Sequence, residues 1–159
     1  MRGGSALSTG IRYSVVPVEY KSIGEMMQAH AEEAVAIART YRVRLDYGEA
    51  SLEKVEEILA GLCREMPRSK PSAEQIEQAC RMWGGYLGEV VRRRWGGDWS
   101  LETYPGANFA TPTLTVVAGK MFPTMKIHRR LFEGPKENIW NFYGMMRRKL
   151  EAIVGNKVH

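Results

Sequence analysis

The stretch from Met82 to Trp99 constrains the fold more than any other part of this chain. Apolar residues recur at three- and four-residue steps between positions 76 and 91, which predicts an amphipathic helix, yet glycines interrupt that pattern. Gly84 and Gly88 lie four residues apart on the flank of the apolar stripe. Because a glycine costs about 1 kcal/mol relative to alanine inside a helix, we expect these two glycines to allow the close approach of another element.

The glycine pair Gly96-Gly97 predicts the end of this helix, since glycine readily takes the left-handed conformations found at helix C-termini. Beyond the pair, helical spacing gives way to short segments rich in Thr, Val and aromatic residues, separated by turns that contain Gly and Pro. The stretch therefore predicts a structural corner, at which a long helix turns into a first strand at Trp99.

The same patterns predict the remaining elements. Helical spacing indicates helices from about Ser22 to Leu45, from an N-cap at Ser51 to a point before Pro67, and after Pro135. Ser72 and Gln75 fit a capping box. Segments 98–104, 111–120 and 121–132 are predicted as strands. The order is typical of an α+β fold, with three N-terminal helices, a small antiparallel three-stranded meander, and a C-terminal helix packed on the sheet.

Length and composition predict one domain. A chain of 159 residues with 44% hydrophobic content can bury a single sizeable core. We expect a loose N-terminal arm or edge strand at residues 1–20 and a single α+β domain at 21–159. No apolar stretch approaches the roughly 20 residues that span a bilayer, and the N-terminus lacks the apolar core of a secretory signal. The expectation is a cytoplasmic protein with no membrane contact.

Two motifs carry a family resemblance that covers roughly residues 40–145. They are the run Gly-Tyr-Leu-Gly-Glu at positions 85–89 and Gly-Gly-x-Trp from Gly96 to Trp99. In these motifs the chain resembles a bacterial family of small proteins of unknown function. The resemblance implies an α+β domain and brings no activity, substrate or cofactor with it.

If the protein is an enzyme, Glu89 is the candidate general acid or base. Such a role requires burial or a charged neighbour that moves its pKa toward neutrality, and a second catalytic group within reach. The helical pattern instead places Glu89 opposite the apolar stripe, where it is solvated or pairs with Arg92 or Arg93. No phosphate-binding glycine loop and no nucleophile elbow accompanies it. The balance favours a protein that is not an enzyme.

Neither a metal nor a cofactor is expected. Asp46, Glu49 and Asp98 flank glycines in loops, where turn and capping roles explain them, and their spacing does not match a calcium loop. The three histidines lie far apart, without the spacing of a metal pair. Cys63 and Cys80 are predicted to be reduced and buried.

Partner binding is the leading functional prediction. The formal net charge is +5, and basic residues gather at 92–94, 126–130 and 147–149. On one face, together with aromatic residues, they would form a nucleic-acid surface, which is the alternative. Three consecutive helical residues point in different directions, however, so a protein partner or a homo-oligomer is preferred. The predicted contact surface combines the exposed side of the sheet with four residues of the third helix, Tyr86, Glu89, Arg92 and Arg93.

Overall fold

The computed structural model describes residues 19–117 and 119–158, and it confirms the α+β class. The described elements are α2 (Ile23–Thr40), α3 (Ser51–Ser69), α4 (Ala73–Trp95), β1 (Asp98–Thr103), β2 (Ala110–Val116), β3 (Gly119–Met121), α5 (Pro123–Glu133), the 3₁₀ turn η2 (Pro135–Glu137) and α6 (Ile139–Val158). The predicted order of three helices, a meander and a closing helix is present, with α5 as an additional helix. The arm predicted at residues 1–20 falls outside the described residues except for its last two positions.

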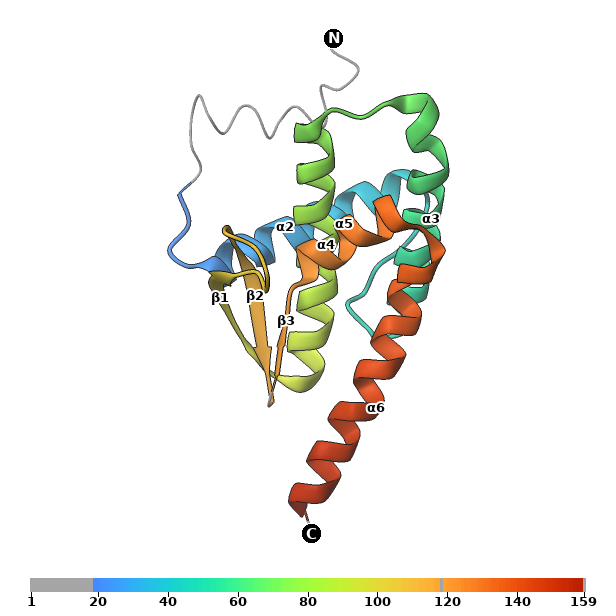
Figure 1. Cartoon of the computed structure of the whole chain (residues 1–159). Coiled ribbons are helices and arrows are strands. Elements are labelled where there is room, and N and C mark those ends of the chain that lie inside the picture. The colour runs from blue at the N-terminus through green and yellow to red at the C-terminus, as the bar shows by residue number, and fades with distance from the viewer. Residues whose placement is uncertain (1–18, 118, 159) are drawn as a thin grey trace.

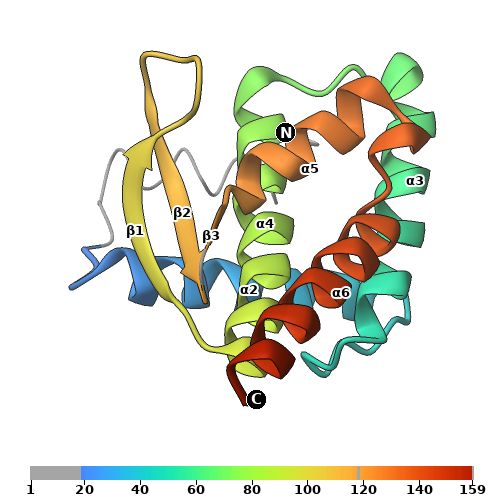
Figure 2. The ribbon, with the colours of Figure 1, turned by 60° about the horizontal axis from the view of Figure 1, so that its bottom comes forward.

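Helix α4 runs through the centre of the molecule, with the sheet on one side and α3 on the other (Figure 1). Helices α2 and α5 both cross α4 (Figure 2), and their closest contacts with it lie near its middle, at Gly85 and Gly84. All residues from Met82 to Val91 are buried. The predicted solvent-facing side of this part of the helix is therefore absent, because α2, α5 and the strands pack around it.

The glycines of α4 are the points at which these neighbours come closest. A Cβ atom on Gly84 would lie 2.7 Å from the Thr124 Cα of α5, and one on Gly85 would lie 2.8 Å from the Met27 carbonyl oxygen of α2. A Cβ on Gly88 would overlap the indole ring of Trp99 in β1. The predicted close approach at Gly84 and Gly88 is thus present, and Gly85 adds a third contact.

The helix boundaries follow the capping signals with three exceptions. Helix α2 ends at Thr40, five residues before the predicted end at Leu45, and the other two exceptions concern α3. The capping box of Ser72 and Gln75 begins α4 as predicted. Helix α3 continues through Pro67 to Ser69, so the predicted end before Pro67 is wrong, and Lys70 ends the helix in the left-handed conformation. Ser51 is the first residue of α3 rather than its N-cap, and its hydroxyl donates to the Gly48 carbonyl at 2.6 Å.

The sheet begins at the predicted corner and is shorter than predicted. Gly96 and Gly97 have positive φ angles of 81° and 142°. Strands β1 and β2 pair antiparallel from Asp98 opposite Thr115 to Thr103 opposite Ala110, and β3 adds only three residues. The third strand predicted at 121–132 is wrong for most of its length, since Pro123 begins helix α5.

Helix α6 packs mainly along α3, whereas α2, α4 and α5 make the main helix contacts with the sheet. The prediction that the C-terminal helix packs on the sheet therefore needs correction: a groove, described below, separates much of α6 from β2 and β3. The C-terminal end of α6 extends beyond the other elements (Figure 1). In the described part of the chain, no helix has the length and apolar character needed to cross a membrane.

Candidate functional site

Glu89 lies at the centre of a buried polar cluster and has no exposed surface. Nε and Nη2 of Arg92 donate to its two carboxylate oxygens at 2.7 and 2.9 Å, and Nε of Arg93 donates at 3.4 Å. The indole N–H of Trp99 donates to Oε2 at 2.9 Å. The predicted pairing with Arg92 and Arg93 is confirmed, and the predicted solvation is wrong because β1 brings Trp99 over the carboxylate.

This arrangement stabilises the ionised form of Glu89. Burial raises the pKa of Glu89, but hydrogen bonds from Arg92 and Trp99 and the charges of Arg92 and Arg93 outweigh it and hold the pKa below 4.5. A general acid or base works best with a pKa near the operating pH. The position of Glu89 therefore suits a structural anion that joins the end of α4 to β1.

Tyr86 is equally buried and fixes the connection between α2 and α3. The backbone N–H of Tyr47 donates to the Tyr86 hydroxyl at 2.8 Å. Because the Ser51 hydroxyl donates to the Gly48 carbonyl, the Tyr86 hydroxyl donates in turn to Ser51 at 2.6 Å. Burial raises the pKa of Tyr86 above its ordinary value of 10.0, which keeps this donor in place.

Only two of the four residues predicted as a contact surface on the third helix are therefore accessible to a partner. Arg92 and Arg93 keep 31% and 43% of their side-chain surface exposed. The Arg93 guanidinium also lies over the Tyr47 ring, 3.5 Å from its centroid, in a cation–π contact. Tyr86 and Glu89 offer no surface to a partner, so their effect on any contact is to hold the two arginines and the neighbouring connection in place.

A second group of polar side chains joins the α2–α3 connection to α6. The Tyr143 hydroxyl donates to Glu49, and the indole N–H of Trp95 donates to the Tyr143 hydroxyl at 3.1 Å. Nε atoms of Arg94 and Arg147 lie 3.7 and 3.9 Å from the Glu49 carboxylate. Burial and the hydrogen bond to Glu49 raise the pKa of Tyr143 to about 12, so it stays a donor at neutral pH.

Of the three loop acids, Asp46 shows the turn role that its spacing predicted, whereas Glu49 belongs to the polar group around Tyr143 and Asp98 begins β1. Asp46 Oδ1 accepts a hydrogen bond from the Gly48 N–H at 2.9 Å. Among the described residues, no group of three or more His, Cys, Asp or Glu side chains could hold a metal ion. His30 pairs with Glu33 at 2.7 Å, and the His128 ring packs against Phe132.

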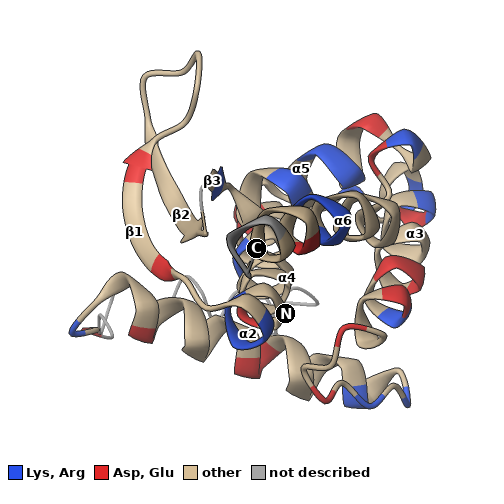
Figure 3. Ribbon diagram, turned by 90° about the horizontal axis from the view of Figure 1, so that it is seen from below, with Lys and Arg blue, Asp and Glu red and all other residues tan. Residues whose placement is uncertain are grey.

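The three basic clusters are largely neutralised by nearby acids. On α5, Lys126 and Arg129 pair with Glu137 at 2.7 and 3.2 Å, and the buried Arg130 pairs with Glu56 of α3 at 2.9 Å. Figure 3 shows the basic segments spread over several elements with acidic segments among them. A continuous basic face with aromatic residues, as the nucleic-acid alternative requires, does not result from these clusters.

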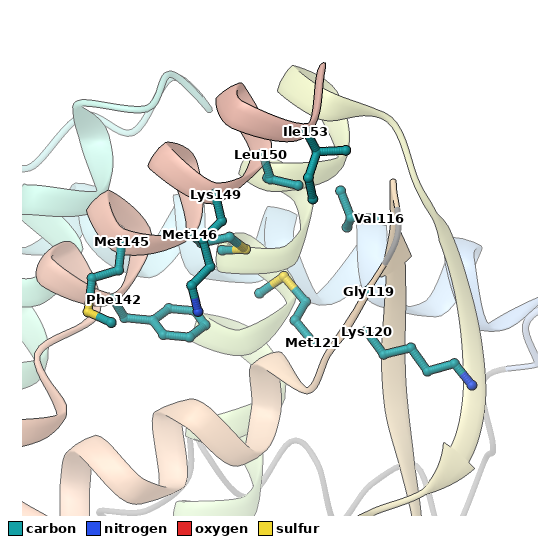
Figure 4. A pocket seen from close by; sticks show the side chains of 10 residues that line it. All are labelled: Val116, Gly119, Lys120, Met121, Phe142, Met145, Met146, Lys149, Leu150 and Ile153. Carbon is teal, nitrogen blue, oxygen red and sulfur yellow. The ribbon is translucent and has the colours of Figure 1, made fainter. Parts of the chain in front are cut away.

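A groove between α6 and the strands β2 and β3 has the features of a binding site. Its volume is about 340 Å³, within the range of about 300 to 1,000 Å³ that is usual for ligand pockets. Helix α6 and the strand segment 116–121 provide its ten lining residues, which Figure 4 shows as sticks: Val116, Gly119, Lys120, Met121, Phe142, Met145, Met146, Lys149, Leu150 and Ile153. Its walls are mainly apolar, and three of the side chains are methionines.

These ten residues form what we call the methionine groove, and burial and charge vary across it. Met121 and Leu150 are buried at its base, whereas Met145 is 53% exposed at its rim. Lys120 pairs with Glu102 of β1, and its side chain points away from α6 in Figure 4. Lys149 is exposed and forms no ion pair with any described residue. One free cation therefore borders an accessible apolar surface.

A second apolar hollow lies beside the β1–β2 hairpin and has a volume of about 740 Å³. Leu101, Phe109 and Phe132 are each about half exposed along it. Its charged residues Glu77 and Arg81 pair with each other at 2.7 Å. The hollow is lined by the hairpin together with residues of α2, α4 and α5, so it is apolar area between the sheet and the helices and not the predicted exposed side of the sheet.

Sequence reasoning missed the methionine groove. A core position was preferred for Met145 and Met146, with an adaptable contact patch as the alternative. The other lining residues were assigned to strands, to the apolar face of the last helix or, for Lys149, to a basic cluster. The excess of apolar positions on α6, including exposed Met145 and Val154, is the signal that could have indicated an incompletely covered helix.

No protein-family model, curated protein or solved structure matches this chain. The resemblance seen in residues 85–99 therefore stays a prediction, and a functional argument rests on the geometry of these sites.

Proposed function

We propose that this protein is a non-enzymatic protein-binding module whose docking site is the methionine groove. The observation that supports this most directly is the half-exposed methionine at the rim of a mainly apolar groove. Methionine side chains are flexible and polarizable, and they are common on surfaces that adapt to partner helices. Exposed apolar surface on a folded domain is typically a site of interaction.

The occupant that fits best is an acidic amphipathic helix of a partner protein. Grooves of this type receive apolar side chains at positions i, i+3, i+4 and i+7 of a helix. Lys149 at the border carries a charge that no described acid pairs with, so an acidic residue flanking the apolar stripe would complement it.

A second copy of the same chain is a poorer occupant. Its own α6 would bring Arg147, Arg148 and Lys149 against the same three residues, with Glu151 as the acid in that region of the helix. Like charges placed together across an interface cost free energy and disfavour the pairing. The homo-oligomer prediction is therefore less well supported than an acidic partner.

Catalysis by Glu89 and nucleic-acid binding are less well supported than protein binding. Catalysis by Glu89 would need an accessible carboxylate, whereas both its oxygens accept hydrogen bonds from Arg92, Arg93 and Trp99. Nucleic-acid binding through the three basic clusters would need cations free of acids, and most of them form ion pairs.

The test is a capture experiment from native lysate with the wild type and three variants. Met145→Glu and Lys149→Glu alter the groove, while Arg148→Glu reverses the charge of the adjacent exposed residue, which does not line it. A bound protein should be retained by the wild type and by Arg148→Glu and lost with both groove variants. Hydrogen exchange of the captured partner should then protect an acidic amphipathic segment.

Two results would contradict the proposal. Equal loss with Arg148→Glu and Lys149→Glu would indicate unspecific charge attraction. A captured protein whose protected segment is neither helical nor acidic would rule out the stated occupant.

A further inference from the structure

A cluster of arginines at the end of α2 is the strongest feature that the proposed function leaves unexplained. Arg39, Arg42 and Arg44 line one hollow of about 510 Å³, together with Val35, Val43, Leu45 and Asp46. All three arginines are exposed, and Val35 and Leu45 are buried beneath them. The hollow shares no residue with the methionine groove.

Each of the three basic clusters contains at least one residue that pairs with an acid, whereas none of these arginines has an acidic partner among the described residues. No ion pair or side-chain hydrogen bond involves Arg39, Arg42 or Arg44 among the described residues. Lys54 adds a nearby cation, since its Nζ donates to the Arg44 carbonyl at 3.3 Å. Asp46 is the one acid among the lining residues, and its Oδ1 already accepts the Gly48 N–H.

The backbone at Arg42 is a second, independent observation. The N–H of Arg42 donates to the Arg39 carbonyl and the N–H of Val43 to the Ala38 carbonyl, each at 2.9 Å, which is the hydrogen-bond pattern of a Schellman motif. Arg42 has a φ of 62°, in the left-handed position that glycine usually occupies. An arginine there is strained, and strained residues cluster at functional sites.

A stabilising role at the helix end explains only part of the cluster. A cation in the last turn of a helix interacts favourably with the dipole, which accounts for Arg39. Arg42 and Arg44 lie beyond the last turn, and a glycine at position 42 would relieve the backbone strain. A guanidinium at this strained position is explained if its charge binds an anion.

We propose that this hollow binds a phosphate group of a small phosphorylated ligand. A guanidinium presents a planar fork of donors that matches phosphate oxygens two at a time, which makes arginine the preferred residue for such sites. Arg39, Arg42 and Arg44 approach the hollow from the last turn of α2 and from the connection after it, so they can surround one anion. This site is independent of the proposed function and stands or falls without it.

The test is a titration of the full chain with inorganic pyrophosphate at low salt, followed by NMR of the backbone amides. Succinate serves as a non-phosphate dianion, adenosine triphosphate as a phosphorylated small molecule, and a short single-stranded oligonucleotide as a polymer. The variants are Arg42→Gly, which removes charge and strain, and Arg44→Ala, which removes charge alone. Arg148→Ala is the matched control at an exposed cation elsewhere.

We expect Arg42→Gly to lower the affinity for pyrophosphate and to raise the thermal stability of the protein. Arg42→Gly should weaken pyrophosphate binding about tenfold, as for the loss of one charge-assisted contact, while its thermal unfolding midpoint rises by about 2 to 4 °C. Arg44→Ala should weaken binding to a similar degree, and Arg148→Ala should bind like the wild type. Amide shifts should concentrate at residues 38–46, and adenosine triphosphate should bind at least as well as pyrophosphate.

Three results would overturn the proposal. Equal binding of succinate would reduce the hollow to a general anion attractor. Unchanged affinity in Arg42→Gly and Arg44→Ala would place the anion elsewhere. Binding of the oligonucleotide without measurable binding of pyrophosphate or adenosine triphosphate would replace the small ligand with nucleic acid.

Discussion

At the residue scale, the hydrogen bonds to Glu89 explain how a charged side chain can be buried in the core. The carboxylate accepts hydrogen bonds from Arg92 and Trp99 and has no exposed surface. Glu89→Gln should lower the free energy of unfolding by about 2 to 3 kcal/mol at neutral pH, because hydrogen bonds to a charged partner are lost and the arginine charges are left less well compensated. Urea unfolding followed by circular dichroism measures this difference.

The pH dependence of that difference follows from the direction of the pKa shift. The folded protein holds the Glu89 pKa below its ordinary value of 4.5, so the unfolded chain binds a proton more readily and stability is lost as the pH falls. The stabilisation is fully present above 4.5 and disappears as the pH falls through the lower, folded-state pKa. The wild type and Glu89→Gln should therefore approach equal stability in acid. A difference that stays constant down to acid pH would show that steric effects, not charge, cause the loss.

Gly88 offers a second test at the residue scale. A Cβ at this position would overlap the Trp99 ring, whereas one on Gly61 of α3 meets nothing closer than an Arg64 guanidinium nitrogen at 3.9 Å. Gly88→Ala should cost about 2 to 3 kcal/mol through overpacking, and Gly61→Ala should gain about 0.5 to 1 kcal/mol through helix propensity. Thermal unfolding of both variants is the measurement, and a stabilised Gly88→Ala would contradict the close packing of α4 against β1.

At the scale of elements, local signals predicted where an element begins and ends better than they predicted whether it is a helix or a strand. The capping box at Ser72 and the glycine pair at Gly96 were found because each depends on a few neighbouring residues. Segment 121–132 was predicted as a strand because the region is rich in Thr, Val and aromatic residues and is divided by turns. The spacing of Ile127 and Leu131, four residues apart, does not decide the question, because such a pair shares one face in either a helix or a strand. Helix prevails since Pro123 suits a first helical position and Arg130, three residues after Ile127, is buried against Glu56.

The Tyr86 side chain of α4 is one of the groups that hold the connection between α2 and α3. The Tyr86 hydroxyl of α4 bonds both the Tyr47 N–H and the Ser51 hydroxyl. Tyr86→Phe should lower the free energy of unfolding by about 1 to 3 kcal/mol, because these polar groups lose their partner. Proteolysis should also cut the connection faster. Tyr41→Phe, at a half-exposed ring, is the matched control and should change stability by less than about 0.5 kcal/mol; equal effects would show that the hydroxyl of Tyr86 is not a tether.

At the scale of the whole molecule, the sequence could not locate the sites because they join distant segments. The methionine groove combines residues 116–121 with residues 142–153, and the pairs around Glu49 link it to Tyr143. Neither depends on spacing within one element. The arginine hollow is local to residues 35–46, but its distinguishing feature is that none of its three arginines pairs with an acid among the described residues, which only the folded arrangement of charges shows.

The packing also predicts an uneven distribution of stability. Residues 82–91 of α4 are all buried among α2, α5 and the strands, whereas residues 151, 152 and 154 of α6 are exposed. Native-state hydrogen exchange should therefore show residues 82–91 opening only with global unfolding, and amides beyond Leu150 opening at least about 2 kcal/mol more easily. Both sets can be read from one exchange experiment on the free protein.

The same experiment connects stability to the proposed docking. A partner helix seated in the methionine groove would contact α6 between Phe142 and Ile153, so binding should raise protection there and leave α4 unchanged. Lys149→Glu should abolish that rise, and Arg148→Glu should not. If the amides beyond Leu150 are already as slow as those of α4 in the free protein, another chain must cover α6. A dependence of the exchange rates on protein concentration would then identify that chain as a second copy, against the charge repulsion argued above.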